Sequence, residues 1–166
     1  MSMYSASLPS LIHMLGNLKK ILQKAAAFAE SRKINPEVLA AYRLAPDMLP
    51  LSSQIQIACD TAKGCGARLS GVEAPRFEDT EKNLVELQQR ITNTLEFLKT
   101  LTPEQIDGTE DKFIELKFPS VTFQFKGVDY VNQFVLPNFY FHMTTAYGIL
   151  RHCGVEIGKS DYLGGI

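Results

Sequence analysis

The sequence predicts an all-α protein, a four-helix bundle with one small β-hairpin inserted before its last helix. Three patterns indicate this fold. Several long segments repeat apolar residues at helical spacing, one short segment alternates with the period of a strand, and residues 130–150 carry no charged side chain. With 166 residues, 45% of them hydrophobic, the chain is large enough for one core. We therefore expect a single domain over 1–166.

The first long helix is expected over 8–33. Ser7 is the predicted cap and Pro9 suits the first turn. The stripe that defines this helix consists of Leu8, Ile12, Leu15, Leu18, Leu22, Ala25 and Ala29. A second start signal at Asn35 and Pro36 predicts one or two further turns, ending near Tyr42.

Two more long helices follow. One is expected over 50–69, where two glycines, Gly64 and Gly66, weaken helix propensity but allow close helix contact. The next should be capped by Asp79 or Thr80, and its stripe is Leu84, Leu87, Ile91, Leu95 and Leu98. The pattern at 102–105 is a capping box and predicts a short extra turn.

The hydrophobic period then changes from that of a helix to that of a strand. Residues 113–118 and 121–126 alternate in polarity around Pro119 and Ser120, which predicts a hairpin. The last long helix is expected over 129–153, with a kink near Pro137 because proline removes one backbone hydrogen bond. Gly154 should end it, and a glycine-rich tail follows.

The uncharged segment 130–150 is long enough to cross a bilayer, but polar side chains interrupt it. They are Asn132, Gln133, Asn138, His142, Thr144 and Thr145. A lipid-facing helix rarely carries so many, whereas a helix inside a bundle that lines a polar cavity can. The segment therefore predicts that any chemistry is centred on His142, and that Phe141 and Ile149 are buried.

Asn138 and Thr145 lie four residues before and three after His142, so they share its helix face. Gln54 and Gln56 occupy the first turns of the second long helix, and one of them is expected to face His142. With no second imidazole on its face of the helix, His142 is either a metal ligand or a buried neutral histidine that bonds to its neighbours.

Asp47 and Asp60 are the carboxylates most able to approach the cavity. Asp47 lies between two prolines, where a turn or cap role competes with ligation, and Asp60 can form an ion pair with Lys63. The aromatic residues near His142 either pack in the core or wall a small-molecule pocket. They are Phe134, Phe139, Tyr140, Phe141 and Tyr147.

Composition and motifs exclude several classes of function. The net charge of −1 gives no reason to expect nucleic acid or an anionic membrane surface. HExxH, P-loop, GxGxxG and Ser-His-Asp patterns are missing, so nucleophilic hydrolysis and nucleotide binding have no support. No secretory signal is recognisable, and the three cysteines are expected to be reduced thiols, which predicts a cytoplasmic location.

Five motifs carry a resemblance to a known family. They are LAPDM at 44–48, QIQIA at 54–58, LPNFYFHMTTAY at 136–147, LRH at 150–152 and GKSDYLG at 158–164. Together they resemble an uncharacterised bacterial domain-of-unknown-function family, similar to the DinB/YfiT-like superfamily of metal-dependent bundles. This resemblance implies an up-down-down-up bundle, a homodimer, and in some relatives a thiol S-transferase activity.

The superfamily pattern places one histidine on the second helix and a His-x-x-x-His pair on the last. In this sequence the later histidine of that pair is His142, the earlier position is Asn138, and the second-helix position falls near Gln54 or Gln56. Neutral amides bind zinc or nickel far less well than imidazole does. The expected cofactor set is therefore none, with a divalent metal at His142 as the alternative.

Three functional hypotheses remain open from the sequence. The first is a non-catalytic bundle protein that binds a small ligand around His142, Asn138, Gln54, Asp47, Thr145 and Tyr147. The second is a metal-dependent, DinB-like enzyme in which His142 is a ligand or a general base. The third is a structural dimer whose buried polar groups bond to one another.

Overall fold

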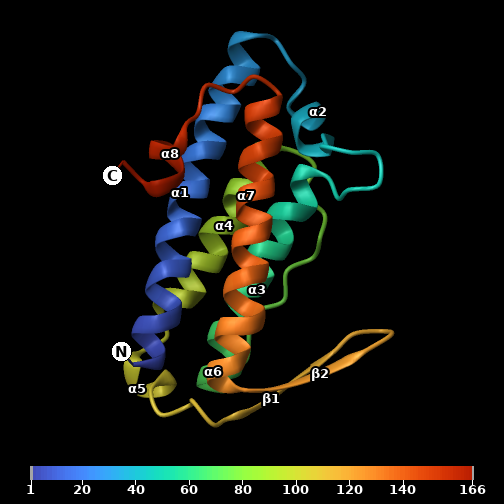
Figure 1. The fold of residues 1–166 in the computed structure, drawn as a ribbon. Helices are drawn as coiled ribbons and strands as arrows, with labels where there is room; N and C mark the ends of the chain where they lie inside the picture. The colour runs from blue at the N-terminus through green and yellow to red at the C-terminus, as the bar shows by residue number, and fades with distance from the viewer. Residues whose placement is uncertain (1, 166) are drawn as a thin grey trace.

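Four long helices form the body of the protein in a computed structural model that describes residues 2–165. They are α1 (Met3–Ser31), α3 (Leu51–Ser70), α4 (Leu84–Lys99) and α7 (Leu136–His152). Figure 1 shows α1 running upward, α3 and α4 downward and α7 upward again. α3 packs mainly against α7 and α4, and α1 packs mainly against α4. The predicted up-down-down-up bundle is confirmed.

α1 begins five residues earlier than the sequence pattern indicated. Ser2 is its N-cap and accepts a hydrogen bond from the Ser5 N–H. Ser7 is wrong as the predicted cap, because its hydroxyl is buried inside the helix and donates to the Met3 carbonyl at 2.6 Å. Pro9 consequently lies within the helix rather than in its first turn. The extra turn buries Met3 in the core.

The short helices follow the local start signals. Asn35 caps α2 (Pro36–Ala41), and the Thr102 N–H donates to Gln105 Oε1 at the start of α5 (Pro103–Ile106). The cap of α4 differs from the prediction, because Asn83 accepts the first amides of that helix in place of Asp79 or Thr80. Asp79 instead forms an ion pair with a side chain of α4, as described below.

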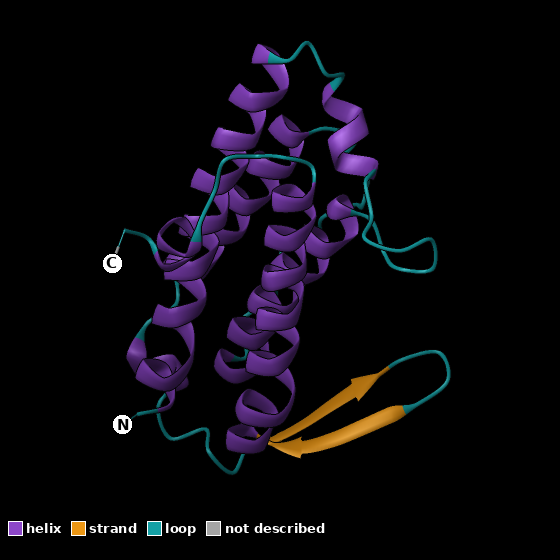
Figure 2. Cartoon of the chain, turned by 45° about the horizontal axis from the view of Figure 1, so that its top comes forward, coloured by secondary structure: helices purple, strands orange, loops and turns teal. Residues whose placement is uncertain are grey.

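The predicted hairpin is present. β1 (Phe113–Lys117) pairs antiparallel with β2 (Thr122–Lys126), and Pro119 and Ser120 form the turn. Figures 1 and 2 show that the hairpin leaves the foot of the bundle and points away from it. Near the bundle, Phe125 packs against Tyr130 and Phe134, with ring centroids 6.2 Å apart in both cases.

The last helix is disturbed before Pro137 rather than kinked at it. α6 (Gly127–Asp129) leads into a π-helical stretch, η1 (Tyr130–Val135), which continues into α7. The Leu136 N–H bonds to the Val131 carbonyl, a spacing of five residues. Because Pro137 has no N–H, the series of backbone hydrogen bonds along the helix must lack one bond here. The wider π turn just before Pro137 accommodates this missing bond.

The glycine-rich C-terminal segment contains a short helix that the sequence analysis did not predict. After Gly154, which has φ +93°, the chain folds back and forms α8 (Lys159–Leu163) against α1. The buried Asn17 side chain of α1 donates to the Tyr162 carbonyl at 3.0 Å. This contact leaves no room for a side chain at Gly164, where an added Cβ would lie 2.6 Å from Asn17 Oδ1.

The core confirms one predicted buried position of α7 and corrects another. Ile149 is fully buried, but Phe141 is 58% exposed, so its predicted burial is wrong. The difference arises because α7 has one face open to solvent, and an uncharged sequence does not mark which face that is. Among residues 2–165, no helix combines the length and apolar character needed to cross a membrane.

Candidate functional site

His142 lies on the face of α7 that packs against α3, and it bonds to Gln54, one of the two glutamines expected to face it. Its Nδ1 is 2.7 Å from Gln54 Oε1. The amide nitrogen of Gln54 donates to the Leu49 carbonyl at 3.1 Å. Both side chains are buried, His142 at 8% exposure and Gln54 at 2%. A chain of hydrogen bonds thus links α7, α3 and the loop before α3.

This chain of bonds assigns the tautomer of His142. The Leu49 carbonyl only accepts, so the Gln54 NH₂ must face it, and Gln54 Oε1 must face the imidazole. An amide oxygen only accepts, so Nδ1 carries the proton. The other nitrogen, Nε2, makes no hydrogen bond within residues 2–165, and it retains some contact with solvent. Nε2 therefore presents a lone pair at the surface.

Burial lowers the pKa of His142 below its ordinary value of 6.5, because desolvation disfavours the imidazolium. Since the unfolded chain then binds the proton more readily, the contribution of His142 to stability should be complete above pH 6.5. This contribution should fall as the pH drops from 6.5 toward the lowered pKa.

We expect the unfolding free energy of His142→Gln to decrease less than that of wild type over this pH range, as measured by urea denaturation. An unchanged pH dependence would contradict the lowered pKa.

Asn138 and Thr145 share the helix face of His142 but bond elsewhere. The Asn138 amide donates to Thr61 Oγ1 on α3 at 2.8 Å. The Thr145 hydroxyl donates to the Phe141 carbonyl of its own helix at 2.8 Å. The structure therefore places a second polar bridge between α7 and α3, one turn away from His142, rather than one cluster of three polar groups.

Neither predicted carboxylate forms a hydrogen bond or an ion pair with His142 in the described part of the chain. Asp47 is exposed in a turn that the Met48 N–H closes onto the Ala45 carbonyl, which agrees with the turn role. Asp60 forms the expected ion pair with Lys63, 2.9 Å from its Nζ.

Of the two glutamines, Gln54 is the one that faces His142. Gln56 donates instead to Glu81 Oε2 at 2.9 Å.

The aromatic residues near His142 in sequence point in several directions. Phe141 packs edge-on against the imidazole, with centroids 5.2 Å apart. Tyr140 bonds to Ser10 of α1, and Tyr147 packs against Tyr162 of α8. Phe134 packs against Phe125 of the hairpin, and Phe139 is fully buried. Phe141 is thus the aromatic ring placed to contact a ligand at His142.

The residues present do not fit the metal site that the fold family implies. Gln54 Oε1 already accepts the bond from the imidazole, and the Asn138 amide nitrogen donates to Thr61, which turns that side chain toward α3. Both are also neutral oxygen or nitrogen donors, which zinc and nickel bind poorly beside a single histidine. Within the described part of the chain, no three His, Cys, Asp or Glu side chains gather in a geometry suited to a metal ion.

A second polar cluster, which the sequence did not reveal, is centred on Arg90 of α4. Its side chain is 1% exposed, and its guanidinium lies 3.0 Å from Asp60, 2.8 Å from Asp79 and 3.1 Å from Glu81. The same group donates to the Glu78 carbonyl at 3.1 Å. Arg90 therefore fastens the irregular segment 71–83 to the bundle.

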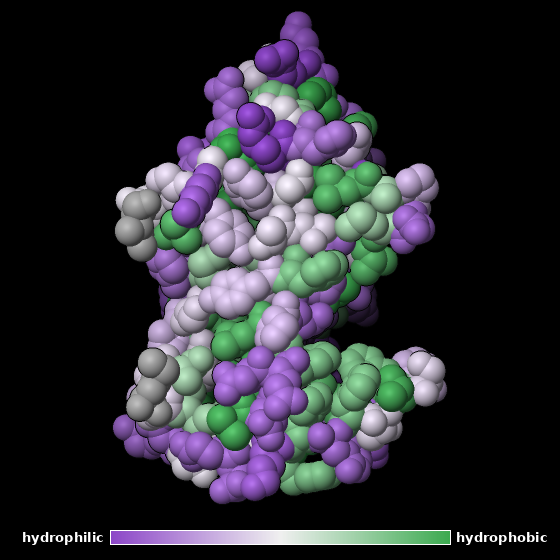
Figure 3. All heavy atoms as spheres, viewed as in Figure 1, coloured by the Kyte–Doolittle hydropathy of each residue, from purple (hydrophilic) through white to green (hydrophobic). Residues whose placement is uncertain are grey.

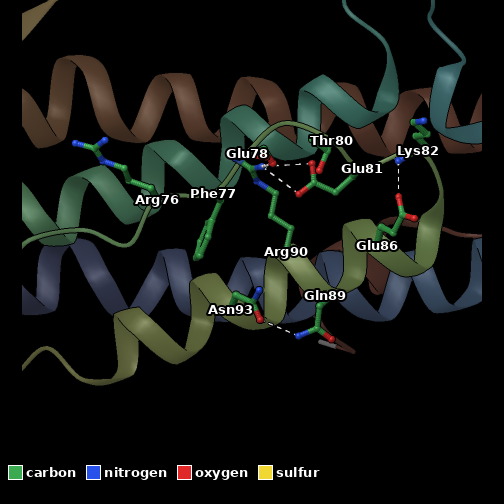
Figure 4. Close-up of a pocket in the computed structure, with 10 residues that line it drawn as sticks. All are labelled: Arg76, Phe77, Glu78, Thr80, Glu81, Lys82, Glu86, Gln89, Arg90 and Asn93. Atoms are coloured by element: carbon green, nitrogen blue, oxygen red, sulfur yellow. Dashed lines mark hydrogen bonds and ion pairs between the residues drawn. The ribbon is translucent and has the colours of Figure 1, made fainter.

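Arg90 lies in the wall of a cavity of about 640 Å³ between α4 and this segment. Figure 4 shows Phe77 beside Arg90 in this wall. Lys63 Nζ lies 4.3 Å from the centroid of the Phe77 ring, and the Arg90 guanidinium carbon lies 5.8 Å from it. One sequence signal points to the burial of Arg90, although not to its partners. Arg90 falls three residues after the inward Leu87, at a position where an exposed arginine is not expected.

Comparison with known proteins places this architecture in a family. The chain matches the family described as Domain of unknown function (DUF1993) over residues 3–163. It belongs to that family. The fold of this DUF1993 protein is similar to that of a solved structure, a DinB family member protein from Shewanella denitrificans. The two are 43% identical with a TM-score of 0.88, over 98% of this chain and 92% of that chain.

No curated protein matches this DUF1993 chain. The resemblance to a DinB-like bundle family is confirmed by the family match and by the solved relative.

Proposed function

We propose that the protein binds a small ligand at His142, in a degenerate form of the metal site of DinB-like bundles. The observation that carries the proposal is the bond from His142 Nδ1 to Gln54, which leaves Nε2 as an accepting lone pair at the surface. A neutral imidazole held in one tautomer is a hydrogen-bond acceptor of fixed direction. The expected ligand therefore carries a hydroxyl, an amine N–H or a thiol.

Apolar side chains beside the site support binding of a ligand with an apolar body. Phe141 is 58% exposed next to the imidazole, and Leu49, whose carbonyl bonds to Gln54, is 47% exposed. Leu44 of the same loop is 44% exposed and reaches toward Gly148 of α7. Exposed apolar side chains that surround a few fixed polar groups are typical of ligand sites.

A thermal-shift screen of metabolites with hydroxyl, amine or thiol groups tests the proposal, followed by calorimetry on each hit. Loss of one hydrogen bond in His142→Gln should weaken binding about 3- to 10-fold, and Phe141→Ala should weaken it by a similar factor. His152→Gln is the matched control, because His152 is exposed on the same helix and bonds to Tyr42. A hit bound equally well by wild type and His142→Gln would argue against this site.

The metal-dependent enzyme is the competing function, and titration with Zn²⁺ or Ni²⁺ separates it from ligand binding. With one imidazole and two neutral amides, we expect binding no tighter than that of a single surface histidine. Nanomolar binding that disappears in His142→Ala would favour the metal-dependent enzyme.

We also propose that the protein works in a reducing, cytoplasmic environment, which suits the free thiols of Cys59, Cys65 and Cys153.

A further inference from the structure

The hairpin separates its side chains by face. Its register places Ile114 opposite Phe125 and Leu116 opposite Phe123, all on the face toward the bundle. Phe118 and Val121, which flank the turn, continue this apolar face by alternation. The other face carries Phe113, Glu115, Lys117, Thr122, Gln124 and Lys126. The hairpin is therefore amphipathic along its whole length.

The bundle covers only the base of this apolar face. Ile114 and Leu116 are 4% and 3% exposed, whereas Phe118, Val121 and Phe123 are between 42% and 45% exposed. We name these last three residues the open apolar tip. Figure 1 shows the distal half of the hairpin standing clear of the helices, and Figure 3 shows hydrophobic atoms gathered along it at the lower right.

The backbone of β2 also presents an open edge. Phe118 and Val121 exchange two backbone hydrogen bonds, of 2.9 and 3.4 Å. Because bonded and non-bonded pairs alternate in an antiparallel ladder, the N–H and C=O groups of Phe123 and Phe125 face β1. Those of Thr122 and Gln124 face the opposite way. Among residues 2–165 the sheet has two strands, so these groups meet no further strand.

The two edges of the sheet differ in charge. On β1 the residues whose backbone faces outward include Glu115 and Lys117, and charged residues are a common protection of edge strands. On β2 the outward residues nearest the turn, Thr122 and Gln124, are uncharged, and the charged Lys126 lies at the base of the strand. The edge of β2 is the one open to pairing.

We propose that two copies of this chain dimerise through β2, forming a four-stranded sheet around a two-fold axis at Phe123. Antiparallel pairing places Thr122 of each copy opposite Gln124 of the other, with their outward backbone groups bonded. Phe123 then lies opposite its own copy in a non-bonded pair, where side chains are closest. The open apolar tips of the two copies become continuous. This inference is independent of the ligand site.

The size of the open apolar tip predicts the strength of the dimer. Its three side chains expose about 250 Å² of apolar surface in each copy, taking about 200 Å² for a whole phenylalanine. A standard interface buries about 800 Å² per partner, slightly more than half of it apolar. The tip thus supplies about half of the apolar area of such an interface. We expect a dimer that dissociates in the micromolar range.

Sedimentation velocity over a range of concentrations up to the submillimolar tests the proposal. Wild type should approach twice the 18.5 kDa of one chain. Gln124→Pro should stay monomeric, because it removes an outward N–H without breaking the bonds between β1 and β2. Glu115→Pro is its matched control on the other edge and should dimerise as wild type does.

A second pair of variants tests the apolar contact. Phe123→Asp should abolish the dimer, whereas Phe113→Asp, on the polar face, should leave it intact. Thermal melts of all four variants should stay near that of wild type, since each changed side chain is exposed. A monomeric wild type, a dimer that persists in Gln124→Pro or Phe123→Asp, or a dimer lost in Glu115→Pro would overturn the proposal.

Discussion

Ile149→Asp is expected to prevent folding of the bundle at neutral pH. The Ile149 side chain is fully buried on α7, where no charged partner is available within that apolar core. An unpaired buried carboxylate costs several kcal/mol even after its pKa rises, which is comparable with the 5–15 kcal/mol that stabilises a typical domain. Circular dichroism with urea denaturation measures the loss, and a cooperative transition near that of wild type would contradict the placement of Ile149.

Phe141→Asp is the matched control, eight residues earlier on the same helix. Phe141 is 58% exposed, so a carboxylate there stays in water. The variant loses mainly the edge-on contact with His142, a loss of about 1 kcal/mol. If Phe141→Asp proved as destabilising as Ile149→Asp, the exposed face of α7 would have been assigned wrongly.

Phe141 illustrates which part of the fold could be predicted and which could not. Helical spacing identified the long helices, because each of them buries a stripe of apolar residues. It could not assign the inner face of α7, where the whole sequence from 130 to 150 is uncharged and apolar residues occur all round. Tertiary packing, and not periodicity, decides that face. The caps at Ser2 and Asn83 were missed for a related reason, since several residues near each start can serve as caps.

The candidate site was predictable to within two residues where the packing of two helices limits the partners, since Gln54 or Gln56 was expected to face His142. Gln54 and His142 lie on helices that the bundle brings together, and their bond is present as expected. Asn138 could bond to His142 or to a residue of the facing helix, and no sequence pattern distinguishes Thr61 as its partner. Arg90 depends on three carboxylates from two other segments, so no local pattern around it discloses the cluster.

Arg90→Met is expected to destabilise the protein by about 3–5 kcal/mol at pH 7, the usual cost of removing one partner from a buried ion pair. Methionine can fill much of the space but pairs with none of the carboxylates. The largest part of this cost arises at Glu81, whose unpaired carboxylate would be only 12% exposed. Asp60 and Asp79 are 44% and 61% exposed, so water can solvate their charges. Urea denaturation gives the difference in free energy. The exposed pair of Lys24 and Asp161 is the control, and Lys24→Met should cost less than about 1 kcal/mol.

The loss in Arg90→Met should also depend on pH, which separates a charge effect from a packing effect. Burial alone would raise the pKa of Glu81, but hydrogen bonds from Gln56 and Arg90 outweigh it and hold that pKa below its ordinary value of 4.5. In wild type, the resulting stabilisation is complete above pH 4.5 and is lost as the pH falls through the lowered pKa. In the variant, burial is no longer opposed by Arg90, so protonation of Glu81 relieves the unpaired charge. The difference in unfolding free energy should therefore shrink between pH 7 and pH 4, and a constant difference would show that packing alone is lost.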